Sequence, residues 1–244
     1  MSLRDHPLLY LFLEAHALAE QRVFLESVAG LPVIEEETNP SNRHGVVKYD
    51  AGPLVVSVNL SPATRFPSST SDGLTMVFAH GDTRRTDTHG HHYLLDGAPG
   101  AAAAMAELRL RVANLGASAR FYRDVLGLRP QPDAAGGPAF ATGTVPIALR
   151  PGGSADDGRR IRYDTYLLVF HTDDIDSTRA ELAARGVAFT GRAVGSKEIG
   201  RTIRFADPSG HRFCLYEPSE EVLTWPSGST VRRILSGQST RSTT

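Results

Sequence analysis

Strand-like alternation followed by helical periodicity occurs three times along the chain. In residues 107–128, apolar and charged residues alternate over the first six positions, which predicts a half-buried strand. The apolar positions are Leu108, Leu110 and Val112. Asn114 is suited to cap the helix that follows, and Gly127 is suited to end it. Residues 8–33 and 166–186 repeat this plan, so each is predicted to hold a strand and a helix.

The last of these copies continues into three further strands. Two of them flank Asp207–Gly210, a DPSG sequence that favours a type I turn and therefore a hairpin. The complete plan is a βαβββ module. A shortened copy at residues 73–97 has a similar first strand and final hairpin, with Gly90 in the place of Gly210, and lacks the helix and two middle strands. The predicted order is one full module, one truncated module and two full modules.

This order suggests a division of the chain into two halves. Residues 1–97 would hold the first module and the truncated module, and residues 107–218 would hold two full modules paired with each other. The Gly- and Ala-rich residues 98–106 are predicted to be a linker. Residues 219–244 are predicted to be a partly disordered tail, because the sequence from Ser227 onwards is rich in Ser, Thr and Arg.

Composition narrows the classes of function. The 244 residues are 41% hydrophobic with a formal net charge of −1, which is typical of a globular protein and gives no electrostatic signature of nucleic-acid binding. No apolar run approaches the roughly 20 residues that a membrane-spanning helix needs. One cysteine allows neither an intrachain disulfide nor a thiolate metal cluster. We expect a cytoplasmic protein with no nucleic-acid or membrane partner.

Two segments carry a resemblance to a known family. Residues 110–128, LRVANLGASARFYRDVLGL, resemble the opening of modules in the vicinal oxygen chelate superfamily, which includes glyoxalase I, bleomycin-resistance proteins and extradiol dioxygenases. Residues 200–218, GRTIRFADPSGHRFCLYEP, resemble the closing hairpin of such modules. The resemblance implies an α+β fold in which tandem βαβββ modules form curled mixed sheets with helices outside and a cavity inside.

Strand parity then assigns side chains to that cavity. If the apolar positions of residues 107–112 pack under the helix, the charged positions face inward. The same argument places alternate residues of the other modules inward. The residues expected to line the cavity are Leu8, Tyr10, Phe12, Glu14, Glu107, Arg109, Arg111, Leu167, Val169, His171, Arg212, Cys214 and Tyr216.

The resemblance also implies where a divalent metal would bind. Enzymes of the superfamily hold Fe, Mn, Ni or Zn through His, Gln or Glu on first strands and Glu on a last strand. In the second half these positions fall on Glu107, Leu167 and Cys214, and in the first half on Leu8, Thr75 and Leu94. Leucine cannot ligate a metal, so we expect no metal site and no cofactor. A divalent metal would be required if this assignment is wrong.

Four histidines are the main objection to a metal-free protein. His80, His89, His91 and His92 lie close together in the sequence. They form either a metal site or a polar hairpin turn beside Asp87. The hairpin turn is favoured, because no partner carboxylate can be identified on an opposing strand.

Glu107 and His171 are the candidate catalytic residues. Glu107 has a catalytic or ligand-binding role, or forms a salt bridge with Arg109. His171 faces the cavity, or bonds Asp173 at the end of its strand. The candidate ligand-binding residues are Tyr10, Phe12, Arg109, Arg111, Arg212, Cys214 and Tyr216. The competing interpretation is that the aromatic residues fill the curl of the sheet and Cys214 is a small buried hydrophobic residue.

Three functions follow. The first is metal-independent binding of a small polar or aromatic organic molecule, of the antibiotic or natural-product resistance type. The second is an enzyme: a ring-cleaving dioxygenase, a glyoxalase-like lyase or isomerase, or a metal-free acid–base catalyst. The third is a non-catalytic interaction protein, compatible with a homodimer, in which the strand edges of the truncated module are covered by a partner.

Overall fold

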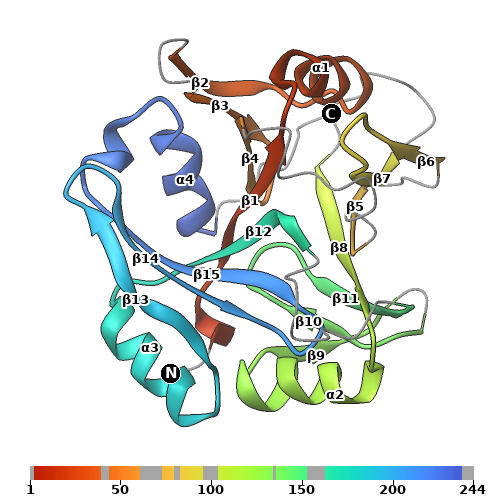
Figure 1. Cartoon of the computed structure of the whole chain (residues 1–244), viewed down its shortest axis with the longest axis vertical. Coiled ribbons are helices and arrows are strands. Elements are labelled where there is room, and N and C mark those ends of the chain that lie inside the picture. The colour runs from red at the N-terminus through yellow and green to blue at the C-terminus, as the bar shows by residue number, and fades with distance from the viewer. Residues whose placement is uncertain are drawn as a thin grey trace.

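The computed structural model describes residues 3–39, 44–60, 73–79, 83–95, 104–133, 136–152 and 163–237. Its strands form one eight-stranded and one seven-stranded sheet, with the helices of the modules packed against their outer faces (Figure 1). His80 and most of the predicted linker lie outside the described residues. This α+β arrangement of modules is the predicted fold class, and the truncated second module is confirmed.

The first module follows the predicted plan of one strand, one helix and three strands. Its helix continues into a π-helical turn. The elements are η1 (Leu3–Asp5), β1 (Leu8–Ala15), α1 (Leu18–Val23), η2 (Phe24–Val28), β2 (Val33–Asn39), β3 (His44–Asp50) and β4 (Val55–Leu60).

The truncated module contains three short strands in its described residues. These strands are β5 (Leu74–Phe78), β6 (Thr83–Thr86) and β7 (His92–Leu95). Strand β6 pairs antiparallel with β7 and is one of the two middle strands that the sequence predicted to be missing, so that part of the prediction is wrong.

The third module repeats the first, including the π-helical turn after the helix. Its elements are β8 (Met105–Val112), α2 (Leu115–Arg120), η4 (Phe121–Val125), β9 (Arg129–Gln131), β10 (Ala139–Ala141) and β11 (Ile147–Pro151). The predicted caps are present: the Asn114 side chain accepts a hydrogen bond from the Ala117 amide, and Gly127 has φ +71°. Strand β8 begins at Met105, so the predicted linker is shorter than residues 98–106.

The fourth module is followed by two helical segments. Its elements are β12 (Tyr163–His171), α3 (Ile175–Ala184), β13 (Phe189–Ser196), β14 (Gly200–Ala206) and β15 (His211–Pro218), and the segments are η5 (Val222–Thr224) and α4 (Gly228–Leu235). Helix α4 contradicts the prediction of a tail from Ser227 onwards. Val231, Ile234 and Leu235 have helical spacing and an apolar surface to pack against, which outweighs the polar composition.

The modules pair differently from the expected halves. The eight-stranded sheet has the order β13-β14-β15-β12-β1-β4-β3-β2, and the seven-stranded sheet has the order β6-β7-β5-β8-β11-β10-β9. The first module therefore pairs with the fourth through β1 and β12, and the truncated module pairs with the third through β5 and β8. The expected pairing of the two C-terminal modules with each other is wrong. Strand β12 pairs with β1 of the first module and not with β8 of the third.

Each sheet is joined to the other through a helix that packs on a hairpin turn. The turn at Asp87–Gly90 lies against α1, and the turn at Asp207–Gly210 lies against α2 and η4. In both turns the aspartate carboxylate accepts two backbone amides, and the final glycine has a positive φ, +81° and +86°. The predicted equivalence of Gly90 and Gly210 is confirmed.

The strand faces agree with the predicted parity, with one exception. The outer positions of β8, β12 and β15 belong to the main hydrophobic core, and Leu167, Val169, Cys214 and Tyr216 belong to a second cluster on the other face of the eight-stranded sheet. We call this second face the inner face. In β1 the register shifts between Leu8 and Tyr10. Leu8 therefore packs in the main core and Leu9 on the inner face, the reverse of the expectation, because one extra residue inverts the alternation.

Candidate functional site

The inner face of the eight-stranded sheet is an ordered grid of side chains. Lys48, Ser57, Phe12 and Leu167 are consecutive partners across β3, β4, β1 and β12. A second row contains Val55, Tyr10, Val169, Cys214 and Arg204. Directly opposite residues project from the same face of a sheet, so the two rows form one continuous surface.

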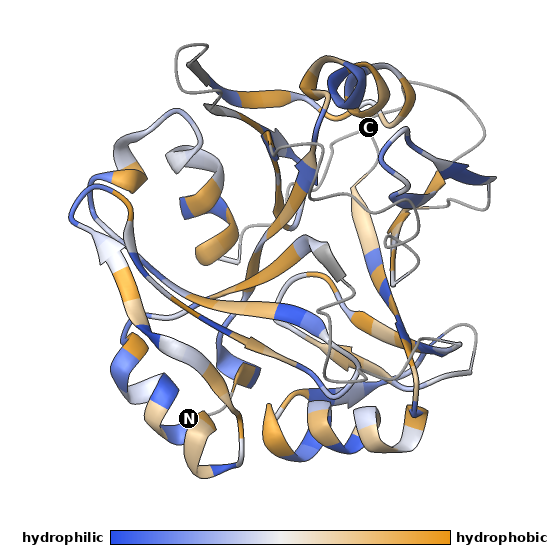
Figure 2. Cartoon of the chain, viewed as in Figure 1, coloured by the Kyte–Doolittle hydropathy of each residue, from blue (hydrophilic) through white to orange (hydrophobic). Residues whose placement is uncertain are grey.

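The C-terminal segment covers part of this surface. Val222, Val231 and Ile234 pack on the inner-face cluster, and α4 contacts β1. Figure 2 shows hydrophobic and hydrophilic bands on α4, as expected for a helix with one buried side. The Arg233 guanidinium fastens the helix by donating two 2.8 Å hydrogen bonds to the Asp50 carboxylate.

An aromatic cavity of about 260 Å³ remains between the sheet and the segment that precedes α4. Four of its lining residues carry aromatic rings: Tyr10, Phe12, Tyr216 and Trp225. The rings of Tyr10 and Phe12 stack with centroids 5.5 Å apart, and Tyr216 meets Tyr10 edge-on at 6.1 Å. The structure thus brings together three of the predicted ligand-binding residues and adds Trp225 from the expected tail.

Polar groups occupy one wall of the aromatic cavity. The Lys48 ammonium lies 2.6 Å from the Glu35 carboxylate and 5.1 Å from the centroid of the Trp225 ring. The Ser227 hydroxyl donates a 2.6 Å hydrogen bond to the other Glu35 oxygen. Burial acts to raise the pKa of Glu35, but hydrogen bonds from Lys48 and Ser227 outweigh it and hold the pKa below the ordinary value. The carboxylate stays ionised and ties the C-terminal segment to β2 and β3.

Ser57 lies at the floor of the same cavity. Its side chain is fully buried, and its hydroxyl oxygen has no hydrogen-bond partner among the described residues. A buried hydroxyl without a partner costs about 1–3 kcal/mol, which is why such groups are rare. Sequence reasoning missed Ser57, since only the pairing of β4 with β1 shows that it faces the cavity.

A second cavity, of about 310 Å³, adjoins the first and shares Phe12, Asn59 and Thr202 with it. Cys214 and Arg212 line it, as predicted, together with Arg204. Burial raises the pKa of the Cys214 thiol to about 12, and the charges of Arg204 and Arg212 only partly oppose this shift. The thiol is therefore protonated near neutral pH, which does not favour a nucleophilic or metal-ligating role.

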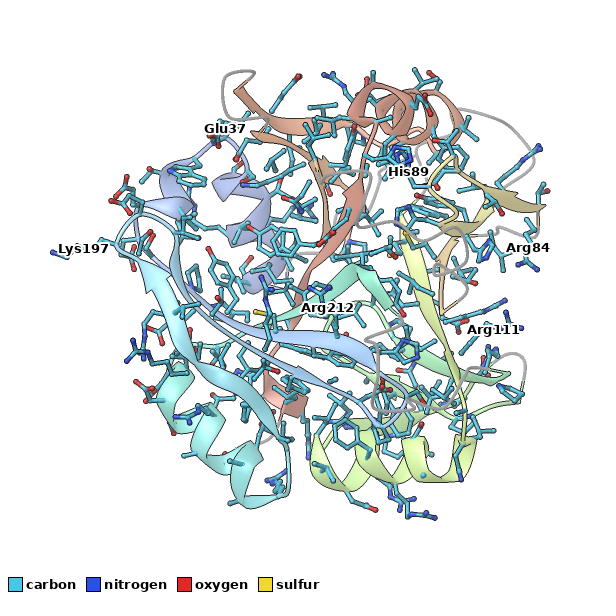
Figure 3. The ribbon with its side chains drawn as sticks, in the orientation of Figure 1. Glu37, Arg84, His89, Arg111, Lys197 and Arg212 are labelled. Carbon is cyan, nitrogen blue, oxygen red and sulfur yellow. The ribbon has the colours of Figure 1, made fainter. Side chains whose placement is uncertain are left out.

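The remaining predicted residues lie elsewhere. Glu107, Arg109 and Arg111 belong to β8 in the seven-stranded sheet, and Figure 3 shows Arg111 well separated from Arg212. The Glu107 carboxylate lies 2.5 Å from Arg109 Nε and 3.4 Å from Arg150 Nη2. The salt-bridge interpretation of Glu107 is thus the one that the structure shows. These residues are not brought together with the aromatic cavity.

His171 is separated from Glu107 because it lies on β12 of the other sheet. It lines a third cavity, of about 450 Å³, whose lining also contains Asp5, Asp173, Glu217 and Glu220. Its Nε2 atom is 3.5 Å from the Asp173 carboxylate. Burial lowers the pKa of His171, and Asp173 only partly opposes this effect. The two candidate catalytic residues do not face one cavity.

The positions implied for a metal can be assigned from the strand pairing. The π-helical turns of the first and third modules begin at Phe24 and Phe121. When the two modules are aligned on these turns, Tyr10 is the residue equivalent to Glu107. Tyr10, and not Leu8, therefore occupies the metal-ligand position on the first strand. In the eight-stranded sheet the positions are then Tyr10, Leu167 and Cys214. Among the described residues, no group of three or more His, Cys, Asp or Glu is arranged to hold a metal. These residues do not fit a divalent ion.

His89 and His91 take part in a hydrogen-bonded network around the turn at Asp87, and His92 Nδ1 lies 2.9 Å from the Thr86 hydroxyl. The Asp87 carboxylate accepts hydrogen bonds from His91 Nδ1 at 2.9 Å, Gln21 Nε2 at 2.8 Å and the Tyr93 hydroxyl at 2.8 Å. His89 Nε2 accepts a hydrogen bond from the Ala17 amide at the start of α1, and His89 lies beside this helix in Figure 3. These contacts agree with the interpretation of the histidine cluster as a polar hairpin turn beside Asp87.

Comparisons with known proteins agree with this architecture. Residues 102–215 match the model of the Glyoxalase/Bleomycin resistance protein/Dioxygenase superfamily. The chain therefore contains a domain of this superfamily. No protein with a curated description matches the sequence.

Two solved structures share the fold over nearly the whole chain. Glyoxalase I from Zea mays matches with a TM-score of 0.64 and 12% identity, covering 96% of this chain and 96% of its own. A candidate dioxygenase from Bacillus subtilis strain 168 matches with a TM-score of 0.62 and 11% identity, covering 94% and 89%. At these identities the similarity concerns the fold. No helix among the described residues is long and apolar enough to cross a membrane.

Proposed function

We propose that this protein binds a small planar organic molecule in the aromatic cavity and does so without a metal. The observation that carries the proposal is the Ser57 hydroxyl, which is buried without a partner at the floor of a cavity walled by aromatic rings. A bound molecule with a polar group would complete this hydrogen bond, while its flat body would pack against Tyr10, Phe12 and Trp225. Binding sites commonly combine an apolar wall with few polar groups in this way.

Metal independence is part of the proposal. Leu167 offers no donor atom, and the Cys214 thiol is buried and protonated at the last-strand position. We therefore expect equal ligand affinity for protein treated with a chelator and for protein supplied with Fe(II), Mn(II), Ni(II) or Zn(II).

The enzymatic alternative has less support. Acid–base catalysis by Glu107 and His171 requires both side chains to reach one substrate, yet they lie on different sheets. Glu107 is moreover paired with Arg109 and Arg150. A sequestering protein of the superfamily, acting on an antibiotic or another natural product, needs only the cavity.

Trp225 provides a direct test. It is the single tryptophan of the chain and lines the cavity, so its fluorescence reports on occupancy. Planar aromatic compounds that raise the melting temperature should also quench Trp225. Replacing Ser57 with Ala should weaken binding roughly 5- to 10-fold, about 1 kcal/mol, without lowering the stability of the free protein.

The matched control is Ser227→Ala. Its hydroxyl bonds Glu35, so this variant should lose stability instead. Absence of any quenching or stabilisation across a broad library of planar aromatic compounds would refute the proposed function.

A further inference from the structure

The two adjoining cavities on the inner face differ in charge. The aromatic cavity has two carboxylates, Glu35 and Glu37, and one ammonium group, Lys48, in its lining. The second cavity has two guanidinium groups, Arg204 and Arg212, and one carboxylate, Glu14. Negative charge therefore exceeds positive charge by one in the first cavity, and the reverse holds in the second.

The two guanidinium groups come from neighbouring strands and line the same cavity. Arg204 on β14 is the register partner of Cys214 on β15, and Arg212 precedes Cys214 by two residues and so shares its face. Arg212 lies near the middle of the molecule in Figure 3. The charges of Arg204 and Arg212 both act to lower the pKa of the Cys214 thiol, although burial outweighs them.

Two neutral polar residues lie at the edge of the same space. Thr202 and Asn59 line both cavities and mark the boundary between them, together with the Phe12 ring. A group that passes Phe12 thus leaves an aromatic wall and meets polar side chains and two guanidinium groups. Guanidinium groups recognise planar oxyanions well, because their N–H groups match the two oxygens of a carboxylate.

We propose that the second cavity is the subsite for an anionic group, so that the ligand is a planar aromatic acid. This inference rests on the proposed function of the aromatic cavity. The flat body lies against Tyr10, Phe12 and Trp225, and the acid group extends past Phe12 toward Arg204 and Arg212. The excess negative charge of the first cavity disfavours the opposite orientation.

Matched pairs of a carboxylate and its neutral carboxamide test the subsite. Calorimetric titration of 2-naphthoate and 2-naphthamide would compare nearly equal shapes that differ in charge. We expect 2-naphthoate to bind at least tenfold more tightly. Arg204→Gln and Arg212→Gln should each reduce this preference to about threefold or less, and high salt should weaken the carboxylate more than the amide.

The control is Arg111→Gln, which removes an arginine of the seven-stranded sheet and should leave the preference unchanged. Melting temperatures within a degree or two of the parent protein would show that the variants are folded. Equal affinity for the two compounds would overturn the anionic subsite while leaving the aromatic-cavity function intact. A preference that persists in both arginine variants would overturn the assignment to these residues. Binding of neither compound would overturn the subsite and count against the proposed function.

Discussion

Asp87 organises the turn of the truncated module as Asp207 organises the turn of the last module. Each carboxylate accepts two backbone amides of its own turn. Asp87 additionally accepts hydrogen bonds from Gln21, His91 and Tyr93, so that side chains of α1 and β7 meet at one buried group. This network anchors the first helix to the seven-stranded sheet.

The acid stability of the protein should depend on Asp87. Burial acts to raise its pKa, but the hydrogen bonds and the charge of His91 outweigh burial and hold the pKa well below the ordinary value of 3.8. A lowered pKa in the folded state stabilises the protein above pH 3.8, and this contribution is lost as the pH falls further. Asp87→Asn should cost about 3 kcal/mol at neutral pH and flatten the acid limb of the stability curve.

Urea unfolding as a function of pH measures both effects. Glu221→Gln, which changes an exposed carboxylate, is the control and should leave the curve unchanged. An Asp87→Asn protein with the parent's acid limb would show that another group controls the low-pH transition.

At the scale of elements, the C-terminal segment completes the candidate site. Helix α4 covers part of the inner face, and the preceding segment supplies Val222 and Trp225 to the aromatic cavity. Its attachment combines apolar packing of Val231 and Ile234 with the Arg233–Asp50 ion pair and the Ser227–Glu35 hydrogen bond. The cavity is therefore incomplete without a segment that the sequence composition did not mark as structured.

Weakening the attachment of α4 should expose the inner face. The Arg233 and Asp50 side chains are less than one quarter exposed, so loss of this bidentate pair by Arg233→Ala should cost about 1–2 kcal/mol. Hydrogen exchange should accelerate in residues 228–235, and Trp225 fluorescence should shift toward that of a solvated indole. Ser229→Ala, on the exposed side of α4, should change neither signal. Unchanged exchange rates in Arg233→Ala would show that apolar packing alone holds the helix.

At the scale of the whole molecule, the pairing of first with fourth and second with third modules links the two halves of the chain. Strand β1 lies between β12 and β4, and strand β8 lies between β5 and β11. Each sheet therefore contains strands from both the N-terminal and the C-terminal half. Neither half can complete a sheet alone, and the strand edges left exposed would favour aggregation.

Fragment complementation tests this topology. Residues 1–97 and residues 98–244, expressed separately, should be insoluble or lack a cooperative unfolding transition. Co-expression should yield a soluble complex with a single transition, because β1–β12 and β5–β8 pairing restores both sheets. A C-terminal fragment that folds cooperatively by itself would contradict the interleaved arrangement and support the division into independent halves.

Part of the candidate site was predictable because it depends on local periodicity. The alternation at Leu108, Leu110 and Val112 fixed which face of β8 is buried, and the same argument placed Cys214 and Tyr216 on the inner face. Parity failed at Leu8 and Leu9, where the β1 register shifts. A bulge depends on the partner strand, so nothing in the sequence of β1 itself reveals it. The roles of Tyr10, Phe12, Arg212 and Tyr216 in ligand binding remain predictions.

The sequence by itself determined the modules, their caps and turns, and the superfamily, because strand alternation, helix spacing and the DPSG turn are local signals. Tertiary structure alone decided which modules share a sheet. It therefore decided that Tyr10 and Ser57 lie on the same sheet face as Cys214 and Arg204, while Glu107 and His171 lie on different sheets. It also decided that residues 228–235 form a helix, since an eight-residue helix is stable only when its apolar side finds a surface to cover. Contacts between strands far apart in sequence depend on the packing free energy of the whole chain, which no local pattern records.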